Sequence, residues 1–151
     1  MVAPERSAIL VDTNILLRAI QQNNPLCSVA KKALKNLHRR NRELCLTPQN
    51  VRKFWNVCTR STDHNGLGMS AAGAGRHVRF LERHFRILPD SALTFSTWLT
   101  LVTVHGVLGA KVHDAWLVAG MKTHGISQIL TFNVGDFARY DGIDCVDPRC
   151  L

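Results

Sequence analysis

Short apolar runs alternate along the chain with longer amphipathic segments. The apolar runs are only three to five residues long and most stop at a polar residue or a proline, as expected of strands buried on both faces. We predict strands at 8–11, 43–46, 86–88, 128–132 and 144–146. Between them apolar residues recur at helical steps, for example at Leu26, Val29 and Ala30. This order predicts an α/β fold with a parallel sheet and helices on both of its faces.

Capping and turn residues mark the ends of the predicted helices. Thr47 and Pro48 have the pattern of an N-cap followed by proline in the first turn, and Gly125 is suited to the position just after a helix. We predict helices at 14–22, 25–40, 48–60, 70–85, from 91 or 94 to 105, and 112–124. No repeat or linker divides the 151 residues. We therefore expect one domain over 1–151, with a frayed segment at 1–7.

The charge of the chain indicates the class of partner. There are 19 lysines and arginines against 11 aspartates and glutamates, and the net charge of +8 favours nucleic acid over an ordinary solvated basic surface. The candidate nucleic-acid-binding residues are Lys31, Lys32, Arg39 and Arg40 in the second predicted helix and Arg76, Arg79 and Arg83 in the fourth. With Arg86, the second group recurs at three- and four-residue steps, so we expect it to form one helix face.

Cysteine usage and hydropathy indicate the compartment. The five cysteines form no Cys-x-x-Cys pair, and their odd number favours a reducing cytoplasm. No apolar run approaches the length of a membrane span, so we expect no membrane partner.

Three aspartates stand where an α/β sheet forms its sites. Asp12 ends the first predicted strand, Asp136 follows the strand at 128–132, and Asp114 lies in the first turn of the helix at 112–124. Each alone is explained as a helix cap or turn residue. Together they predict a carboxylate cluster that a hard divalent cation, Mg²⁺ or Mn²⁺, would stabilise. Such an ion activates water, so we predict metal-dependent hydrolysis of nucleic acid.

Four segments resemble the PIN-domain family in order and spacing. They are 11–17, 47–60, 113–119 and 129–137, and they are most similar to the VapC-type ribonuclease toxins of that family. The resemblance implies a three-layer α/β/α sandwich with a four- or five-stranded parallel sheet. It implies a Mg²⁺- or Mn²⁺-dependent endoribonuclease that is the toxin of a toxin–antitoxin pair. It also implies RNA and a VapB-like antitoxin as partners, and a homodimer.

The resemblance assigns roles to individual residues. The acidic metal-site positions of the family are matched by Asp12, Asp114 and Asp136, and Asn133 is a further candidate ligand. Asn14 and Thr131 match polar positions that orient the site. His113 precedes one of the aspartates, but the resemblance defines no role for it.

Lys53 departs from the family pattern, in which a glutamate usually precedes the Phe-Trp pair. Without the resemblance, Lys53 is a solvated helix residue. With it, we predict that Lys53 points into the acidic groove while Phe54 and Trp55 pack inward. Its ammonium would attract all three aspartates, take the place of the metal and impair hydrolysis. A natural inactive paralogue and a single-base Glu-to-Lys lesion are both compatible with this residue.

Other functions remain open. A non-cleaving PIN scaffold would bind RNA or an antitoxin through its basic helices, and salt-sensitive binding without a metal-dependent product would favour it. A related nuclease would cut DNA, which a comparison of single-stranded RNA with DNA would reveal. A set of large apolar residues is either ordinary core or an exposed groove for a partner helix. It consists of Leu17, Trp98, Leu99 and Trp116.

Overall fold

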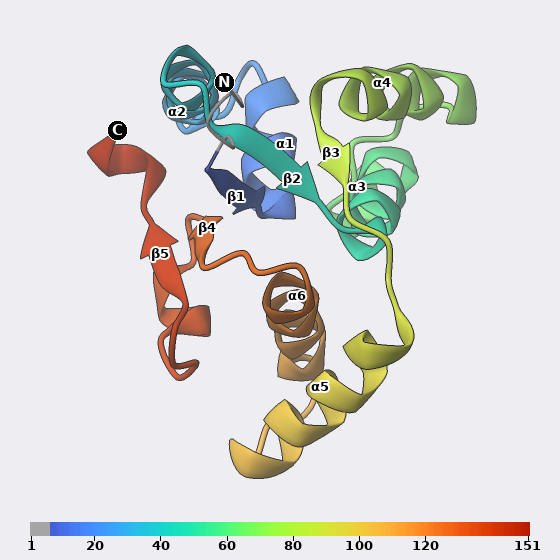
Figure 1. Cartoon of the computed structure of the whole chain (residues 1–151). Coiled ribbons are helices and arrows are strands. Elements are labelled where there is room, and N and C mark those ends of the chain that lie inside the picture. The colour runs from blue at the N-terminus through green and yellow to red at the C-terminus, as the bar shows by residue number, and fades with distance from the viewer. Residues whose placement is uncertain (1–6) are drawn as a thin grey trace.

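A single parallel sheet forms the centre of the molecule (Figure 1). The computed structural model describes residues 7–151, so the predicted frayed segment 1–7 lies outside it except for Ser7. The strands are β1 (Ala8–Val11), β2 (Glu43–Leu46), β3 (Arg86–Ile87), β4 (Gln128–Leu130) and β5 (Asp144–Val146). Their order across the sheet is β3-β2-β1-β4-β5, and every neighbouring pair is parallel. The prediction of a parallel sheet is confirmed.

Within residues 7–151, six α-helices connect and cover the strands. They are α1 (Thr13–Ile20), α2 (Cys27–Arg39), α3 (Pro48–Thr59), α4 (Ala71–His84), α5 (Ala92–Val104) and α6 (Lys111–Thr123). Each lies within a few residues of its predicted range. Helix α2 begins later than predicted because Asn24 first forms a turn, in which its side-chain oxygen accepts from the Leu26 N–H at 2.9 Å. Short 3₁₀ helices follow at η1 (Thr62–His64), η2 (Val134–Phe137) and η3 (Pro148–Cys150).

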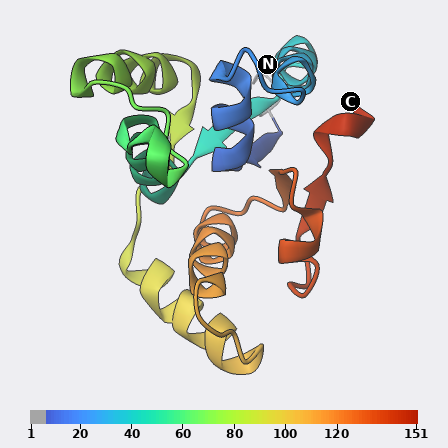
Figure 2. The ribbon, with the colours of Figure 1, turned by 180° about the vertical axis from the view of Figure 1, so that it is seen from behind.

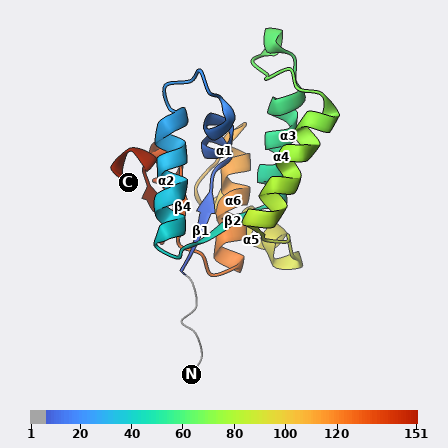
Figure 3. The same cartoon turned by 90° about the horizontal axis from the view of Figure 1, so that it is seen from above.

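The side chains of β1 show how the layers form. Ile9 and Val11 are fully buried against the helices α1–α4, whereas Leu10 is buried on the other face, in a cluster with Ala115 and Val118 of α6. Figure 3 shows α1–α4 side by side on one side of the sheet, with α6 behind it. Because both faces are covered, the strands carry no polar face. The predicted three-layer α/β/α sandwich is confirmed.

Helix α5 lies at the outside of this sandwich, packed on α6 and away from the strands (Figure 2). It carries apolar residues all round, and four of them are strongly exposed: Leu93 at 66%, Phe95 at 55%, Leu99 at 48% and Val104 at 72%. Leu17 of α1, by contrast, is buried in the core. The interpretation as ordinary core therefore holds for Leu17, whereas Leu99 is exposed; a groove for a partner helix stays a prediction.

Two side chains lie elsewhere than predicted. Trp55 is 38% exposed, whereas Phe54 is fully buried. Consecutive helix residues point about 100° apart, so both could not face the core, and the Trp55 ring lies beside Gly75 of α4 instead. Arg86 does not continue the face of α4, because it begins β3 and pairs with Glu43 of β2 at 2.9 Å.

No helix within residues 7–151 combines the length and the apolar character needed to cross a lipid bilayer.

Candidate functional site

The strand order places a crevice between β1 and β4. The chain leaves β1 into α1, on one face of the sheet, and leaves β4 towards η2, which packs on the other face. A crevice opens at the carboxyl ends of strands where successive connections diverge in this way. Val11 pairs with Leu130, so the next residues, Asp12 and Thr131, lie side by side at its mouth.

Asp12 is held rigidly in this crevice. The Thr131 hydroxyl donates to Asp12 Oδ2 at 2.8 Å, and Asn14 Nδ2 donates to the same oxygen at 3.4 Å. Asn14 also donates to the Thr131 hydroxyl oxygen at 3.3 Å. Only 6% of Asp12 is exposed, and Thr131 is fully buried. Asn14 and Thr131 thus fix one carboxylate oxygen of Asp12 at the edge of the pocket.

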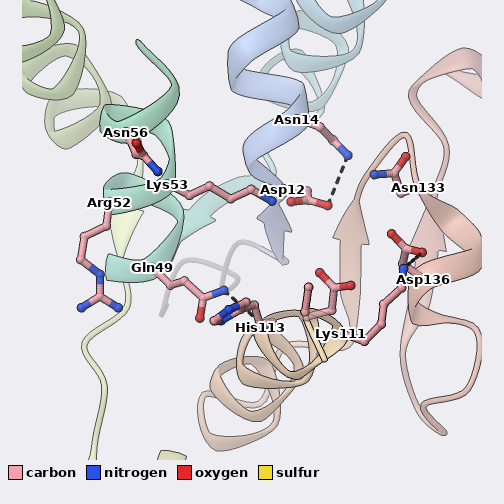
Figure 4. A pocket seen from close by; sticks show the side chains of 12 residues that line it. Asp12, Asn14, Gln49, Arg52, Lys53, Asn56, Lys111, His113, Asn133 and Asp136 are labelled. Atoms are coloured by element: carbon pink, nitrogen blue, oxygen red, sulfur yellow. Dashed lines mark hydrogen bonds and ion pairs between the residues drawn. The ribbon is translucent and has the colours of Figure 1, made fainter. Parts of the chain in front are cut away.

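A pocket above this carboxylate collects Lys53 and most of the predicted metal-site and accessory residues (Figure 4). It is lined by Asp12, Asn14, Gln49, Arg52, Lys53, Asn56, Ala110, Lys111, His113, Asp114, Asn133 and Asp136. These residues come from four separate segments: the end of β1 with α1, α3, the start of α6, and the segment after β4. Of the predicted metal-site and accessory residues, only Thr131 does not line the pocket, because it lies beneath Asp12.

The three aspartates interact electrostatically. Burial raises the pKa of Asp12, and the charge of Asp136 adds to this rise. Burial also raises the pKa of Asp114, and the charges of Asp136 and Asp12 raise it further. Their oxygens, with that of Asn133, are hard donors of the kind Mg²⁺ and Mn²⁺ prefer, and a cation would relieve the repulsion. The donor chemistry therefore fits a divalent metal.

Lys111 opposes such a metal at one of the three carboxylates. Its ammonium pairs with Asp136 Oδ1 at 2.5 Å, and this hydrogen bond raises the pKa of Lys111. Sequence reasoning did not identify this residue. The sequence does contain a signal from which Lys111 could have been found: it precedes Asp114 by three positions on a helix, and this spacing puts both residues on one helix face.

Lys53 acts on the other two aspartates from α3. In Figure 4 its side chain extends toward Asp12. Within residues 7–151 it forms no ion pair, yet its charge lowers the pKa of both Asp12 and Asp114, against the effect of burial. We expected one lysine to act on all three aspartates; instead Lys111 pairs with Asp136, Lys53 acts on Asp12, and the charges of both lysines act on Asp114. In this arrangement no three His, Cys, Asp or Glu side chains of residues 7–151 are grouped closely enough to hold a metal.

A buried amide sets the position of α3, and hence of Lys53. Asn50 Oδ1 accepts from the Thr47 N–H at 2.8 Å, and the Asn50 N–H donates to Thr47 Oγ1 at 3.2 Å, which closes a capping box. Asn50 Nδ2 also donates to Thr13 Oγ1 at 3.1 Å and so links α3 to α1. At the same end of α3, Gln49 Nε2 donates to the His113 carbonyl at 2.9 Å and links α3 to α6.

Replacing Asn50 by alanine should lower the free energy of unfolding by about 2 kcal/mol, because the capping box loses the Asn50 side chain and the buried Thr47 N–H and Thr13 hydroxyl lose their hydrogen bonds to it. Urea unfolding at neutral pH measures this change. Asn56→Ala is the matched control, since Asn56 is exposed on the same helix. An equal effect of the two substitutions would show that the buried network does not set the stability of α3.

Stability should depend on pH through Asp12. Because its pKa is raised above 3.8 by folding, the unfolded chain ionises more readily, and Asp12 lowers the unfolding free energy at neutral pH. This penalty disappears as the pH falls through the folded pKa toward 3.8. Asp12→Asn should therefore stabilise the protein at neutral pH, with a difference that shrinks on acidification.

Urea unfolding in chelator at a series of pH values measures that difference. Asp63→Asn removes one negative charge at an exposed position and serves as the control. A stability difference for Asp12→Asn that stayed constant down to about pH 4 would contradict the linkage.

The predicted nucleic-acid-binding residues lie outside the pocket. Lys31, Lys32, Arg39 and Arg40 are exposed along or just after α2, and Arg76, Arg79 and Arg83 are exposed on α4. Figures 1 and 3 place these two helices at opposite ends of the α1–α4 layer. The cations at the pocket are instead Arg52, Lys53 and Lys111. Of these, sequence reasoning singled out only Lys53.

Solved structures with this fold are known. FitAcB from Neisseria gonorrhoeae has a TM-score of 0.70 and 19% identity, over 95% of this chain and 99% of that one. A toxin–antitoxin complex from Klebsiella pneumoniae has a TM-score of 0.64 and 19% identity, over 93% and 97%. VapC20 from Mycobacterium tuberculosis, described as a sarcin–ricin loop cleaving toxin, has a TM-score of 0.58 and 18% identity, over 80% and 86%. At these identities the likeness concerns the fold.

Sequence comparison identifies the family. No curated protein is significantly similar to the chain. The sequence profile of the PIN domain, however, matches residues 9–143, which include all but the first residue of β1, the strands β2 to β4 and all the residues that line the pocket. This chain therefore belongs to the PIN domain family.

Proposed function

We propose that this PIN domain is a VapC-type toxin, an endoribonuclease that depends on Mg²⁺ or Mn²⁺ and is impaired in this form by Lys53. One observation carries the proposal: Asp12, Asp114 and Asp136, from three distant segments, line one pocket at the switch point of the sheet. A lysine extends into that pocket toward Asp12 (Figure 4).

The roles of the residues follow from their positions. Asp12, Asp114 and Asp136 would hold the metal, with the Asn133 amide oxygen as a further ligand. When bound, the metal would supply an activated water and neutralise charge on the phosphodiester. Thr131 and Asn14 keep Asp12 oriented. Lys53 and Lys111 supply positive charge to the same carboxylates and so compete with the metal.

RNA is the proposed substrate. The net charge of +8 favours a polyanion. The exposed cations of α2 and α4 would hold the RNA strand outside the pocket. These cations are Lys31, Lys32, Arg39 and Arg40 on or just after α2, and Arg76, Arg79 and Arg83 on α4. VapC20, which shares the fold, is described as cleaving the sarcin–ricin loop.

The proposed protein partners are a VapB-like antitoxin and a second copy of the chain. The toxin–antitoxin complex from Klebsiella pneumoniae shares the fold and supports the first. The exposed apolar residues of α5 support the second, since a homodimer would bury them. All five cysteines are unpaired thiols, which supports the cytoplasm as the compartment.

The proposal is tested by comparing RNA cleavage by the protein with cleavage by its Lys53→Glu variant, each with Mn²⁺, Mg²⁺ or chelator. The substrates are single-stranded RNA and DNA of the same sequence. We expect only the glutamate form to cut, only RNA, and only with metal. Cleavage of DNA alone would identify a different nuclease.

A second candidate function is a PIN scaffold that binds RNA or an antitoxin without cutting. Two ammonium groups in the pocket, and the lack of three grouped ligands among residues 7–151, favour it. Binding of RNA by both forms, with no product from either, would establish this function.

A further inference from the structure

A second hollow lies next to the acidic pocket. It is lined by Gln49, Arg52, Asp90, Trp98, Val112, His113 and Trp116. Gln49, Arg52 and His113 also line the acidic pocket, so the two hollows share one wall. The hydrogen bond from Gln49 to the His113 carbonyl holds that wall together. A ligand that fills both hollows needs a charged part for one and a flat apolar part for the other.

The apolar part of the second hollow is a fixed pair of indoles. The ring of Trp116, on α6, lies 5.6 Å from that of Trp98, on α5, at an angle of 55°. Trp98 Nε1 donates to the Val112 carbonyl at 2.9 Å, and Trp116 Nε1 donates to Asp90 Oδ1 at 3.2 Å. Both rings are only partly buried. Their polar edges are thus bonded to the protein while ring surface remains available, as in a pre-organised stacking platform.

Arg52 adds an unused cation beside the indoles. In Figure 4 its guanidinium points away from Asp12, unlike the neighbouring Lys53. Within residues 7–151 no hydrogen bond or ion pair of its side chain is present, and it is exposed. A guanidinium is planar, stacks on flat rings and binds phosphate. Arg52 is therefore available to a ligand in either hollow.

We propose that the second hollow binds an unpaired base of the RNA strand whose phosphodiester enters the acidic pocket, with the base stacked on Trp116 and flanked by Arg52. The inference rests on the proposed function and names how the substrate is held. Single-stranded RNA is commonly recognised by stacking of splayed bases on aromatic rings and guanidinium planes. An apolar peptide side chain would leave the Arg52 guanidinium without a partner, whereas a base presents to it a flat face for stacking and polar edges for hydrogen bonds.

Binding without cleavage tests the proposal. A labelled, unstructured single-stranded RNA is titrated with the protein in chelator, and fluorescence anisotropy gives the Kd. Trp116→Leu should weaken binding roughly tenfold, the effect of losing one stacked base. An RNA of the same length with abasic riboses keeps the phosphates, so Trp116→Leu should not change its Kd.

A second variant keeps the test independent of folding. Arg52→Lys, at an exposed position, retains the positive charge but replaces the planar guanidinium, which can stack on a base, by an ammonium that cannot. It should weaken binding of the base-containing RNA several-fold and leave binding of the abasic RNA unchanged. Lys122→Ala removes a cation at the other end of α6 from the pocket and shows how much a general loss of positive charge weakens RNA binding, for comparison with Arg52→Lys, which loses none. Thermal melting verifies that each variant is folded.

The outcomes separate this inference from the proposed function. An unchanged Kd of Trp116→Leu for normal RNA, or an equal loss for abasic RNA, would overturn the base site even if Lys53→Glu cuts RNA. A base-dependent loss in Trp116→Leu and Arg52→Lys supports the base site even if no form of the protein cuts. Failure to bind RNA at all would overturn the base site.

Discussion

Replacing Lys53 by glutamate is expected to raise metal-dependent RNA cleavage by on the order of a hundredfold or more, the usual contribution of one catalytic side chain. The substitution removes the ammonium that extends toward Asp12 and places a carboxylate at the same point of α3. The pocket would then carry four acids, and the metal would no longer compete with Lys53. Gel analysis of labelled RNA with Mn²⁺, Mg²⁺ or chelator measures the change.

Two further variants identify the cause. Lys53→Gln removes the positive charge without supplying a carboxylate. Any cleavage that this variant gains over the unsubstituted protein therefore measures how strongly the ammonium alone inhibits the site. Lys122→Glu makes the same charge change at the far end of α6 and should have no effect. If Lys53→Glu binds RNA but produces no cleavage with either metal, the hydrolase proposal fails and the scaffold is the better account.

Asp12→Asn, introduced into the Lys53→Glu protein, is expected to return cleavage to background, a loss of the same order as the gain. Asparagine still accepts the hydrogen bond from Thr131 but has no charge for a metal. At neutral pH the same substitution should raise the melting temperature in chelator, because it removes a buried carboxylate whose pKa burial raises. Cleavage assays and thermal melting of the same preparations measure both effects.

A loss of activity together with a gain in stability is the mark of a residue kept for function. Asp63→Asn, at an exposed aspartate of η1, should change neither property. If the Asp12→Asn double variant melted at a lower temperature than its parent, Asp12 would have a structural role and the loss of cleavage would not identify a ligand.

The strands and helices were predictable because local signals and tertiary packing agree. Buried apolar runs such as 8–11 suit a sheet covered on both faces. Thr47 and Pro48 start α3 as their chemistry requires. The positions of Asp12 and Asp136 after apolar strands predicted that they would lie at the same edge of the sheet, because parallel strands end there together, and both line the pocket.

The remaining features depend on distances that no local pattern encodes. Lys111 pairs with Asp136, 25 residues away, and only the packing of α6 beside η2 brings them together. Arg52 and Lys53 are adjacent in sequence but lie in different surroundings, since neighbours on a helix point about 100° apart. The same rotation explains why Trp55 is exposed while Phe54 is buried.

The insertion of β4 between β1 and β5 has a consequence for synthesis of the protein on the ribosome. Until β4 emerges, β1 has an unpaired edge on that side, and Thr131 is not present to orient Asp12. Asp136 emerges later still. A nascent chain that ends before these residues therefore has an incomplete pocket, with neither the partner that orients Asp12 nor one of the three aspartates.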